Sequence, residues 1–432
     1  MMNTVFTLKI DGLAFGGAGV GRDEGGKVVF VRGAYPGDVA LVRAEKNRKR
    51  HIEAGLVRVL EPSPHRVFPA CPHSEDCGGC PWMGLSYGVQ LKWKQKIVED
   101  LLKRIGGMKT APAKAKPSPK ELGYRARVRL KVAVSRGVTR IGYHRPRSND
   151  IVNISRCPVA NGKVNEILEQ IRSFLGKNPG PFQDVGEIEI ETGGPAESGR
   201  VILHTKKQMK KEVVERFLES IPSLQAVAAR HGGDMQVAGD AFLETRTLDG
   251  MTLRFGPGVF SQVNPGQNLE MTKTVRRLAG LSAGMSGLDL FCGMGNLTIP
   301  LAAAGAAMTG VEANPLAVAD ANSNRDRLRV MTASFSEGSA KEATRKMLRE
   351  GLRFDTVIAD PPRGGIANMV SEAAGLARER IVYISCDPAA MARDAGKLAE
   401  LGFHLQSVEP CDMFPQTSHV EVVSLFTRRP VA

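Results

Sequence analysis

The stretch GLDLFCGMGNLTIP, residues 287–300, decides the fold that we predict for the last third of this chain. Its apolar start is typical of a buried strand, a turn with Gly293 and Gly295 follows, and a helix is expected to begin near Asn296. Glycines at such a turn let a ligand approach the backbone, and a helix N-terminus offers free N–H groups. The pattern is GxGxxT and not GxGxxG, so it favours a nucleoside ligand without a tight pyrophosphate site.

Three further apolar runs around this stretch end in residues that could carry chemistry. MTGVE ends at Glu312, FDTVIADPP contains Asp360, and ERIVYISCDP contains Cys386. Their alternation with helical segments predicts an α/β, doubly wound, mainly parallel sheet. Glu312 follows Gly293 by nineteen residues, close to the spacing of about 20 at which an acid meets ribose hydroxyls. We therefore expect S-adenosylmethionine (SAM) as the cofactor, with NAD as the main competitor.

The chain of 432 residues is longer than the ~250 to 300 residues at which single cores stop growing. Residues 4–60 alternate apolar and polar positions between Gly-rich turns, which predicts a small OB-like β-barrel. The runs YRARVRLKVAV and TRIGYHRP predict a hairpin with arginines on one face. We expect an N-terminal RNA-binding module at 1–61, a central mixed α+β domain at 62–258 and a cofactor-binding domain at 259–432.

The positive charge of the chain is concentrated in one segment. The net charge is +14, and residues 92–145 hold 16 Lys or Arg against three acids, an excess of 16 − 3 = +13. Such a density attracts a polyanion. A lysine-rich surface that only maintains solubility is the alternative. The clustering favours nucleic acid as a partner.

Three cysteines fall within ACPHSEDCGGCPW, residues 70–82, at Cys71, Cys77 and Cys80. The N-terminus has no cleavable apolar block, and the longest apolar tract is broken by Asp289, Asn296 and glycines, so we expect no membrane span and a cytoplasmic protein. Thiols stay reduced there, and clustered cysteines more often bind metal or do chemistry than form disulfides.

Cys386 and Glu421 are the candidates for catalysis. The thiol follows a predicted strand whose carboxyl end faces the ligand crevice, although a small buried residue is the alternative. Glu421 lies in an apolar, predicted penultimate strand, where a carboxylate is costly without a partner or a task. A thiol, an acid and a methyl donor suit methylation of uracil C5: the thiolate adds to C6, and a base later removes the C5 proton. His419 is a rival base.

Taken together, these blocks resemble the bacterial RNA 5-methyluridine methyltransferases, in particular those of 23S ribosomal RNA that carry an N-terminal TRAM domain. The similarity covers essentially the whole chain and lies in these blocks, in the family's order: CPHSEDCGGC, GYRARVRLKV, DIVNISRCPV, FSQVNPGQN, LDLFCGMGNLTIPLA, ADPPRGG, SCDP and DMFPQTSHVE. The resemblance implies 23S ribosomal RNA as substrate and a 4Fe-4S cluster. It places the cluster on Cys71, Cys77, Cys80 and Cys157. Four thiolates suit such a cluster, and structural zinc is the alternative.

The resemblance also assigns roles to single residues. It makes Cys386 the nucleophile and Glu421 the base, and leaves Cys292 and Cys411 as packing residues. A further family contact falls near Ser334, where the Asn of the family is absent. With the two glycines of the turn, the expected cofactor-binding residues are Gln262, Phe291, Gly293, Gly295, Asn296, Glu312 and Asp360.

Other functions stay open on sequence grounds. The same reaction could take place on transfer RNA or on another 23S uridine, and the chain could be a non-catalytic RNA-binding or assembly factor. A DNA cytosine methyltransferase is disfavoured because the Pro-Cys-Gln motif around its thiol is absent. Nothing in the sequence indicates an obligate protein partner, and we expect a monomer.

Overall fold

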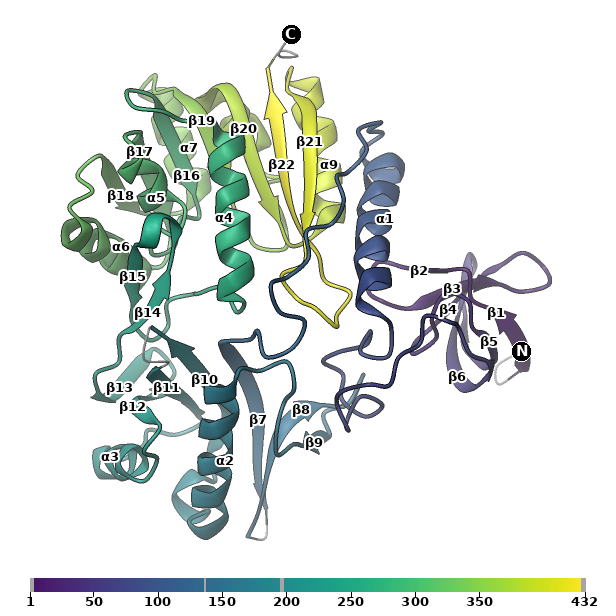
Figure 1. Cartoon of the computed structure of the whole chain (residues 1–432). Coiled ribbons are helices and arrows are strands. Elements are labelled where there is room, and N and C mark those ends of the chain that lie inside the picture. Colours follow the sequence, from purple (N-terminus) through teal and green to yellow (C-terminus); the bar gives the residue numbers. More distant parts are fainter. Residues whose placement is uncertain (1–3, 136, 195–197, 429–432) are drawn as a thin grey trace.

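A computed structural model describes residues 4–135, 137–194 and 198–428. Within these residues the strands form four sheets, which follow one another along the chain (Figure 1). None of the helices in the described ranges is long and apolar enough to cross a bilayer.

The N-terminal segment forms a six-stranded sheet in the order β1-β5-β6-β4-β3-β2, so the predicted β-rich module is confirmed. Its alternating apolar residues, among them Leu8, Val29 and Val42, are buried in one small core. The strands are β1 (Val5–Lys9), β2 (Gly12–Leu13), β3 (Gly19–Arg22), β4 (Val28–Val31), β5 (Val39–Asn47) and β6 (His51–Glu61).

The central sheet has seven strands in the order β13-β12-β11-β10-β7-β8-β9. The predicted hairpin is present as the antiparallel pair β7 and β8. On β7, Arg127, Arg129 and Lys131 face away from the buried Val128 and Leu130. The elements are β7 (Arg127–Ser135), β8 (Val138–His144), β9 (Ile151–Asn153), α2 (Gly162–Lys177), a 3₁₀ turn (Gly180–Phe182), β10 (Val185–Gly193), β11 (Ser198–Thr205), α3 (Lys211–Glu219), β12 (Leu224–His231) and β13 (Asp234–Gly239).

The C-terminal sheet is doubly wound, as predicted, with the order β18-β17-β16-β19-β20-β22-β21. Neighbouring strands from β18 to β20 are parallel, and β22 is antiparallel to both of its neighbours. The strands are β16 (Ser286–Leu290), β17 (Ala307–Glu312), β18 (Ala333–Glu337), β19 (Phe354–Ala359), β20 (Ala377–Ser385), β21 (His404–Cys411) and β22 (Glu421–Thr427). A two-stranded sheet of β14 (Leu243–Arg246) and β15 (Thr252–Phe255) precedes it, with a 3₁₀ turn (Leu248–Gly250) between them.

Helices cover both faces of this sheet. They are α4 (Pro265–Ala279), α5 (Thr298–Ala303), α6 (Pro315–Leu328), α7 (Ala340–Arg349), α8 (Val370–Leu376) and α9 (Pro388–Glu400). Helix α1 (Tyr87–Ile105) comes from far upstream in the chain but packs beside α9, and its Val98 and Leu102 join the same hydrophobic core (Figure 1). Helix α1 precedes the central sheet in the chain, yet it is packed into the C-terminal domain that follows that sheet.

Candidate active site

Cys386 lies at a tightly fixed junction between a strand and a helix. It follows β20 directly, and Asp387 then caps α9 by accepting hydrogen bonds from the backbone N–H groups of Ala389 and Ala390. The Ser385 hydroxyl donates to the Asp387 carbonyl at 2.8 Å. The thiol is half-buried at the carboxyl end of the parallel strands, where ligands bind in such sheets.

Glu421 lies beside this thiol, on the neighbouring strand β22. Strands β20 and β22 pair with Ser385 opposite Val422, so Cys386 and Glu421 come next, just beyond the last pair of the ladder. Glu421 is only 7 % exposed. It begins the last strand of the described residues, so our placement of it in a penultimate strand was wrong. The chemical reasoning is unaffected, because it depended on the apolar run around the carboxylate.

The charges around the two side chains shift both pKa values upward. Burial, with Asp360 adding to it and Arg363 opposing it, raises the pKa of Glu421 to about 8. Burial, with the negative charges of Glu421 and Asp360, raises the pKa of the Cys386 thiol to about 11, and Arg363 again opposes the shift. Arg363 was missed in the sequence analysis, although it comes three residues after Asp360 in ADPPR.

A small cavity of about 50 Å³ lies at the carboxyl end of β16 and β19. It brings together most of the expected cofactor-binding residues, which come from segments up to 98 residues apart (360 − 262 = 98). Gly293 has φ 54°, and a Cβ added there would meet no atom within 4 Å, so its backbone is open to a ligand. The expected residues that line the cavity are Gln262, Phe291, Gly293, Asn296 and Asp360.

Gly295 and Glu312 stabilise the Gly-rich turn after β16 and do not line this cavity. A Cβ on Gly295, at φ 89°, would come within 2.9 Å of Ile299, so this glycine is needed for close packing. Glu312 accepts hydrogen bonds from the N–H groups of Gly293 at 3.0 Å and Asn314 at 2.8 Å. Ser334 lies exposed on the edge strand β18 and bonds the Met308 carbonyl.

Asp289 is a cavity residue that the sequence analysis missed. It is fully buried at the end of β16, and one of its oxygens accepts a hydrogen bond from Thr298 at 2.6 Å while the other has no partner in the described residues. Burial raises the pKa of Asp289 to about 7 and that of Asp360 to about 6. Together with Glu421, these carboxyl groups give the site an excess of acidic groups. That excess suits a cationic ligand such as a sulfonium and disfavours a pyrophosphate.

Residues 412–420, between β21 and β22, lead directly into Glu421 and are held from several sides. Lys94 of α1 is completely buried and donates to Asp412 at 2.5 Å and to the Phe414 carbonyl at 3.0 Å. Gln416, at φ 69°, exchanges hydrogen bonds with Gln90 of α1. Its carbonyl also accepts from the Trp82 N–H. A non-glycine residue persists in this conformation only when its surroundings impose it.

We expect the substitution Lys94→Met to lower the free energy of unfolding by about 3–5 kcal/mol, because it leaves the buried Asp412 without a counter-charge. The double variant Lys94→Met/Asp412→Leu should recover most of this loss, since no unpaired charge remains. Urea unfolding followed by circular dichroism measures both values. Equal stability of Lys94→Met and wild type would contradict the role given to this pair.

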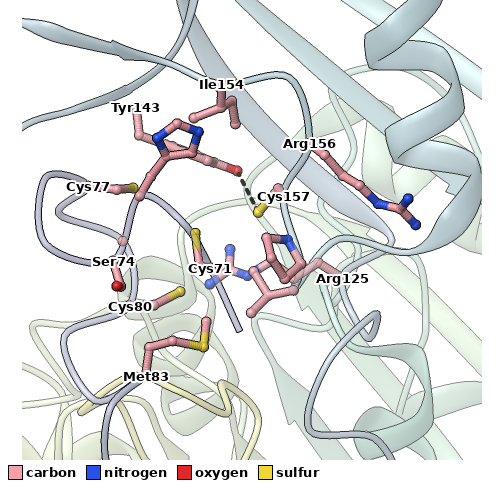
Figure 2. A pocket seen from close by; sticks show the side chains of 14 residues that line it. Cys71, Ser74, Cys77, Cys80, Met83, Arg125, Tyr143, Ile154, Arg156 and Cys157 are labelled. Carbon is pink, nitrogen blue, oxygen red and sulfur yellow. Dashed lines mark hydrogen bonds between the residues drawn. The ribbon is translucent and has the colours of Figure 1, made fainter. Parts of the chain in front are cut away.

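Cys71, Cys77, Cys80 and Cys157 line one cavity of about 80 Å³, together with Met83, Tyr143 and Ile154 (Figure 2). The first three lie in the loop before α1, and Cys157 follows β9. The Tyr143 hydroxyl contacts the Cys157 sulfur at 4.0 Å. Burial raises the pKa of Cys80 to about 12, and the charge of Arg125 opposes that shift. The structure therefore brings together the four cysteines that the resemblance selected.

The four cysteines come from two separate segments and line the same cavity. Among the described residues, no group of three or more His, Cys, Asp or Glu side chains is arranged so that it could hold a metal ion. Four cysteine thiols are the donor set of a 4Fe-4S cluster and also of a structural zinc site, so the donor chemistry alone fits either group. A tetrahedral zinc site needs all four ligands around one ion.

Comparisons with known proteins identify relatives over the full length of the chain. A 23S rRNA (uracil(1939)-C(5))-methyltransferase from Aeromonas hydrophila is 31% identical over 97% of this chain and 96% of its own. One from Photorhabdus laumondii is 32% identical over 98% and 97%. The crystal structure of Pyrococcus abyssi tRNA (uracil-54, C5)-methyltransferase with S-adenosyl-L-homocysteine superposes with a TM-score of 0.76. It is 27% identical and covers 98% of this chain and 100% of its own.

Two family models match the chain. The model of the tRNA (uracil-5-)-methyltransferases matches residues 86–429, and that of the TRAM domain matches residues 1–57. The first model covers most of the chain and includes both Cys386 and Glu421. The chain is therefore a SAM-dependent member of the RNA uracil-5-methyltransferase family, with a TRAM domain at its N-terminus.

Proposed function

We propose that this protein methylates C5 of a specific uridine in 23S ribosomal RNA through a covalent bond between Cys386 and C6 of the uracil ring. The observation that carries this proposal is the placement of Cys386 opposite Glu421, beside the cavity that holds Asp289 and Asp360. It supplies a nucleophile, a base and a site for a cationic methyl donor within one crevice.

The reaction proceeds in two halves. The Cys386 thiolate adds to C6, and the resulting enolate makes C5 nucleophilic enough to take the methyl group from the sulfonium. Glu421 then removes the proton from C5, the C5–C6 double bond re-forms, and the sulfur leaves C6. Arg363 favours the thiolate. A uracil stacked in folded RNA cannot reach Cys386, so it must first be flipped out of its stack.

Activity is expected to rise with pH between about pH 6 and about pH 9, by roughly tenfold or more, because both groups act in their deprotonated forms. Glu421, with a pKa of about 8, is mostly protonated at the lower end of this range, and so is the thiol. Single-turnover methylation at saturating RNA and SAM measures the profile. A rate that falls as the pH rises would contradict the roles of both groups.

Ribosomal RNA is the preferred substrate because the relatives from Aeromonas and Photorhabdus act on 23S rRNA and span this whole chain. Transfer RNA is a second candidate, because a solved structure that is similar to 98% of this chain is that of a tRNA (uracil-54, C5)-methyltransferase. Methyl transfer from labelled SAM to separate transcripts of 23S and transfer RNA distinguishes them. We expect product on the ribosomal transcript, and product on transfer RNA alone would contradict the proposal.

We further propose that Cys71, Cys77, Cys80 and Cys157 hold a 4Fe-4S cluster. The cluster would tie the loop before α1 to the segment after β9, and so fix the parts of the central domain that we place at 62–258. The support is the ring of thiols around the cavity and the cation of Arg125 beside it, which suits an anionic cluster.

Anaerobic purification is expected to yield about four iron and four sulfide per chain, with a broad visible absorbance. Cys80→Ser should lose iron and absorbance. Cys411→Ser is the control, because Cys411 is buried in the C-terminal core and away from this cavity. Zinc without iron in the wild-type protein would refute the cluster and leave the methylation proposal intact.

A further inference from the structure

A depression of about 320 Å³ lies on the TRAM domain, and none of the residues that line it is assigned to methyl transfer. Its wall comes from the turn after β2, from β4, from the β5–β6 hairpin, and from the turn between β8 and β9 of the central sheet. The volume is at the lower end of the range of about 300 to 1,000 Å³ for small-ligand sites. The depression is therefore large enough for one nucleotide and too small for a folded element.

Aromatic rings form part of the wall. Phe15, on the Gly-rich turn after β2, is 44% exposed. Phe30 lies deeper, and the His51 ring meets it edge-on with centroids 5.4 Å apart. Exposed aromatic rings of this kind are platforms for nucleobases, because every base has a face that stacks.

Charged groups of both signs complete the wall. Glu45 and Glu53 are about one-third exposed and offer carboxylate oxygens. Arg32 is exposed and has no hydrogen bond or ion pair with any described residue. Arg147 bonds Glu45 at 3.0 Å from the β8–β9 turn, at φ 57°, so two sheets are joined across the depression.

A cationic run borders the depression. The β5–β6 turn carries KNRKR, residues 46–50, and all five side chains are exposed. Arg48 and Lys46 lie within 4 Å of Glu53, whereas Lys49 and Arg50 make no ion pair in the described part of the chain. Free cations beside an aromatic depression suit a phosphate backbone that enters it.

We propose that this depression binds one unpaired nucleotide of the RNA substrate, outside the target uridine. The base stacks on Phe15, its exocyclic amino group donates to Glu45 or Glu53, and Lys49 and Arg50 contact the flanking phosphates. Carboxylates accept from the amino groups of A, C or G, which uracil lacks. An acidic peptide is disfavoured, because its carboxylates would meet Glu45 and Glu53. This inference rests on the proposed RNA-methylating function.

The test compares full-length wild type with Phe15→Ala and with Phe242→Ala. Phe242 is a matched control, because it is 45% exposed and lies outside the depression. Fluorescence anisotropy measures binding of single-stranded oligo(A), oligo(C) and oligo(U). Phe15→Ala should weaken oligo(A) and oligo(C) binding by about tenfold, the effect of losing one stacked base. Phe242→Ala should change neither.

Two further variants separate the contact of the base with a carboxylate from the contacts of the cations with phosphates. Glu45→Gln should reduce the preference for oligo(A) and oligo(C) over oligo(U). Lys49→Glu/Arg50→Glu should weaken all three oligonucleotides and lower the salt dependence of binding by about one unit of slope per lost phosphate contact. In methylation assays, Phe15→Ala should raise the KM for the long RNA and leave kcat unchanged.

The outcomes distinguish this inference from the proposed function. If Phe15→Ala binds oligo(A) and oligo(C) as tightly as Phe242→Ala and wild type do, and wild type methylates RNA, the inference is wrong and the methylation proposal stands. Capture of a peptide or protein by this face, with no effect of Phe15→Ala on RNA, would also refute it. If wild type methylates no RNA but Phe15→Ala still loses oligonucleotide binding, the depression is a nucleotide site and the proposed reaction is wrong.

Discussion

Replacing Cys386 with Ser is expected to lower the rate of methyl transfer by about 10⁴-fold or more, because a serine hydroxyl is far less acidic than a thiol and forms too little of the anion that must add to C6. Without addition at C6, C5 of uracil is too weakly nucleophilic to take the methyl group. The side chains have similar volumes, and the Asp387 cap of α9 is untouched, so the fold should be retained.

Single-turnover methylation of the RNA substrate measures this effect. RNA binding and SAM binding are the controls, and both should stay close to wild type. Cys411→Ser removes another thiol and should retain activity, since Cys411 is packed in the C-terminal core and carries no catalytic role. Methylation by Cys386→Ser within tenfold of wild type would exclude nucleophilic catalysis by this residue.

The substitution Glu421→Gln should stop the reaction after methyl transfer and not before it. The amide has the same shape as the carboxylate but cannot accept the C5 proton, so the methylated RNA stays bonded to Cys386. The first half should be preserved, because the charge of Glu421 raises the pKa of the thiol and its removal favours the thiolate. Multiple turnover should fall by about 10²- to 10⁴-fold, the usual contribution of a general base.

Denaturing gel electrophoresis and mass spectrometry detect this covalent protein–RNA complex as a protein band that carries RNA and one extra methyl group.

His419→Gln tests the rival base. His419 lies at the surface, where incomplete solvation of the imidazole together with the charges of Arg363, Lys94 and Arg125 lowers its pKa. The His419→Gln variant should methylate RNA over many turnovers at a rate near that of wild type. Accumulation of the complex with His419→Gln and normal turnover by Glu421→Gln would assign the base to His419.

Local signals in the sequence predicted much of the site. Glycines at a strand–helix turn, an acid at the end of the next strand and a thiol at the end of another are each visible within a few residues. Their common location follows from one rule, that the carboxyl ends of parallel strands share an edge. That rule was sufficient to place Cys386 near Asp360, whose charge helps to raise the pKa of the thiol.

Residues that act through distant partners were missed for a physical reason. Lys94 belongs to an amphipathic helix, and from the sequence it cannot be distinguished from a surface lysine, because Asp412, its partner, lies 318 positions away. Asp289 carried the same signal as Glu421, a carboxylate in an apolar strand, and it could have been found by applying that criterion to every strand.

The basic segment shows a second limit of sequence reasoning. On β7, Arg127 pairs with Glu189, and both Arg129 and Lys131 pair with Glu187 of β10. The register of β7 and β10 places Lys131 directly opposite Glu187 and makes the other two pairs diagonal neighbours, although the strands are about sixty residues apart in sequence. Part of the excess charge is therefore neutralised within the protein. The cations available to RNA are therefore those without an ion pair among the described residues, such as Lys103 and Lys109 of this segment and Lys49 and Arg50 outside it.

The most direct test of the account uses RNA in which the target uridine is replaced by 5-fluorouridine. Fluorine at C5 cannot be removed as a proton, so the reaction should stop with the methylated base bonded to the protein. After incubation with SAM and digestion, we expect the RNA fragment on the peptide that contains Cys386, and none with Cys386→Ser. Turnover of normal RNA without any adduct on Cys386 from the fluorinated RNA would contradict the covalent mechanism.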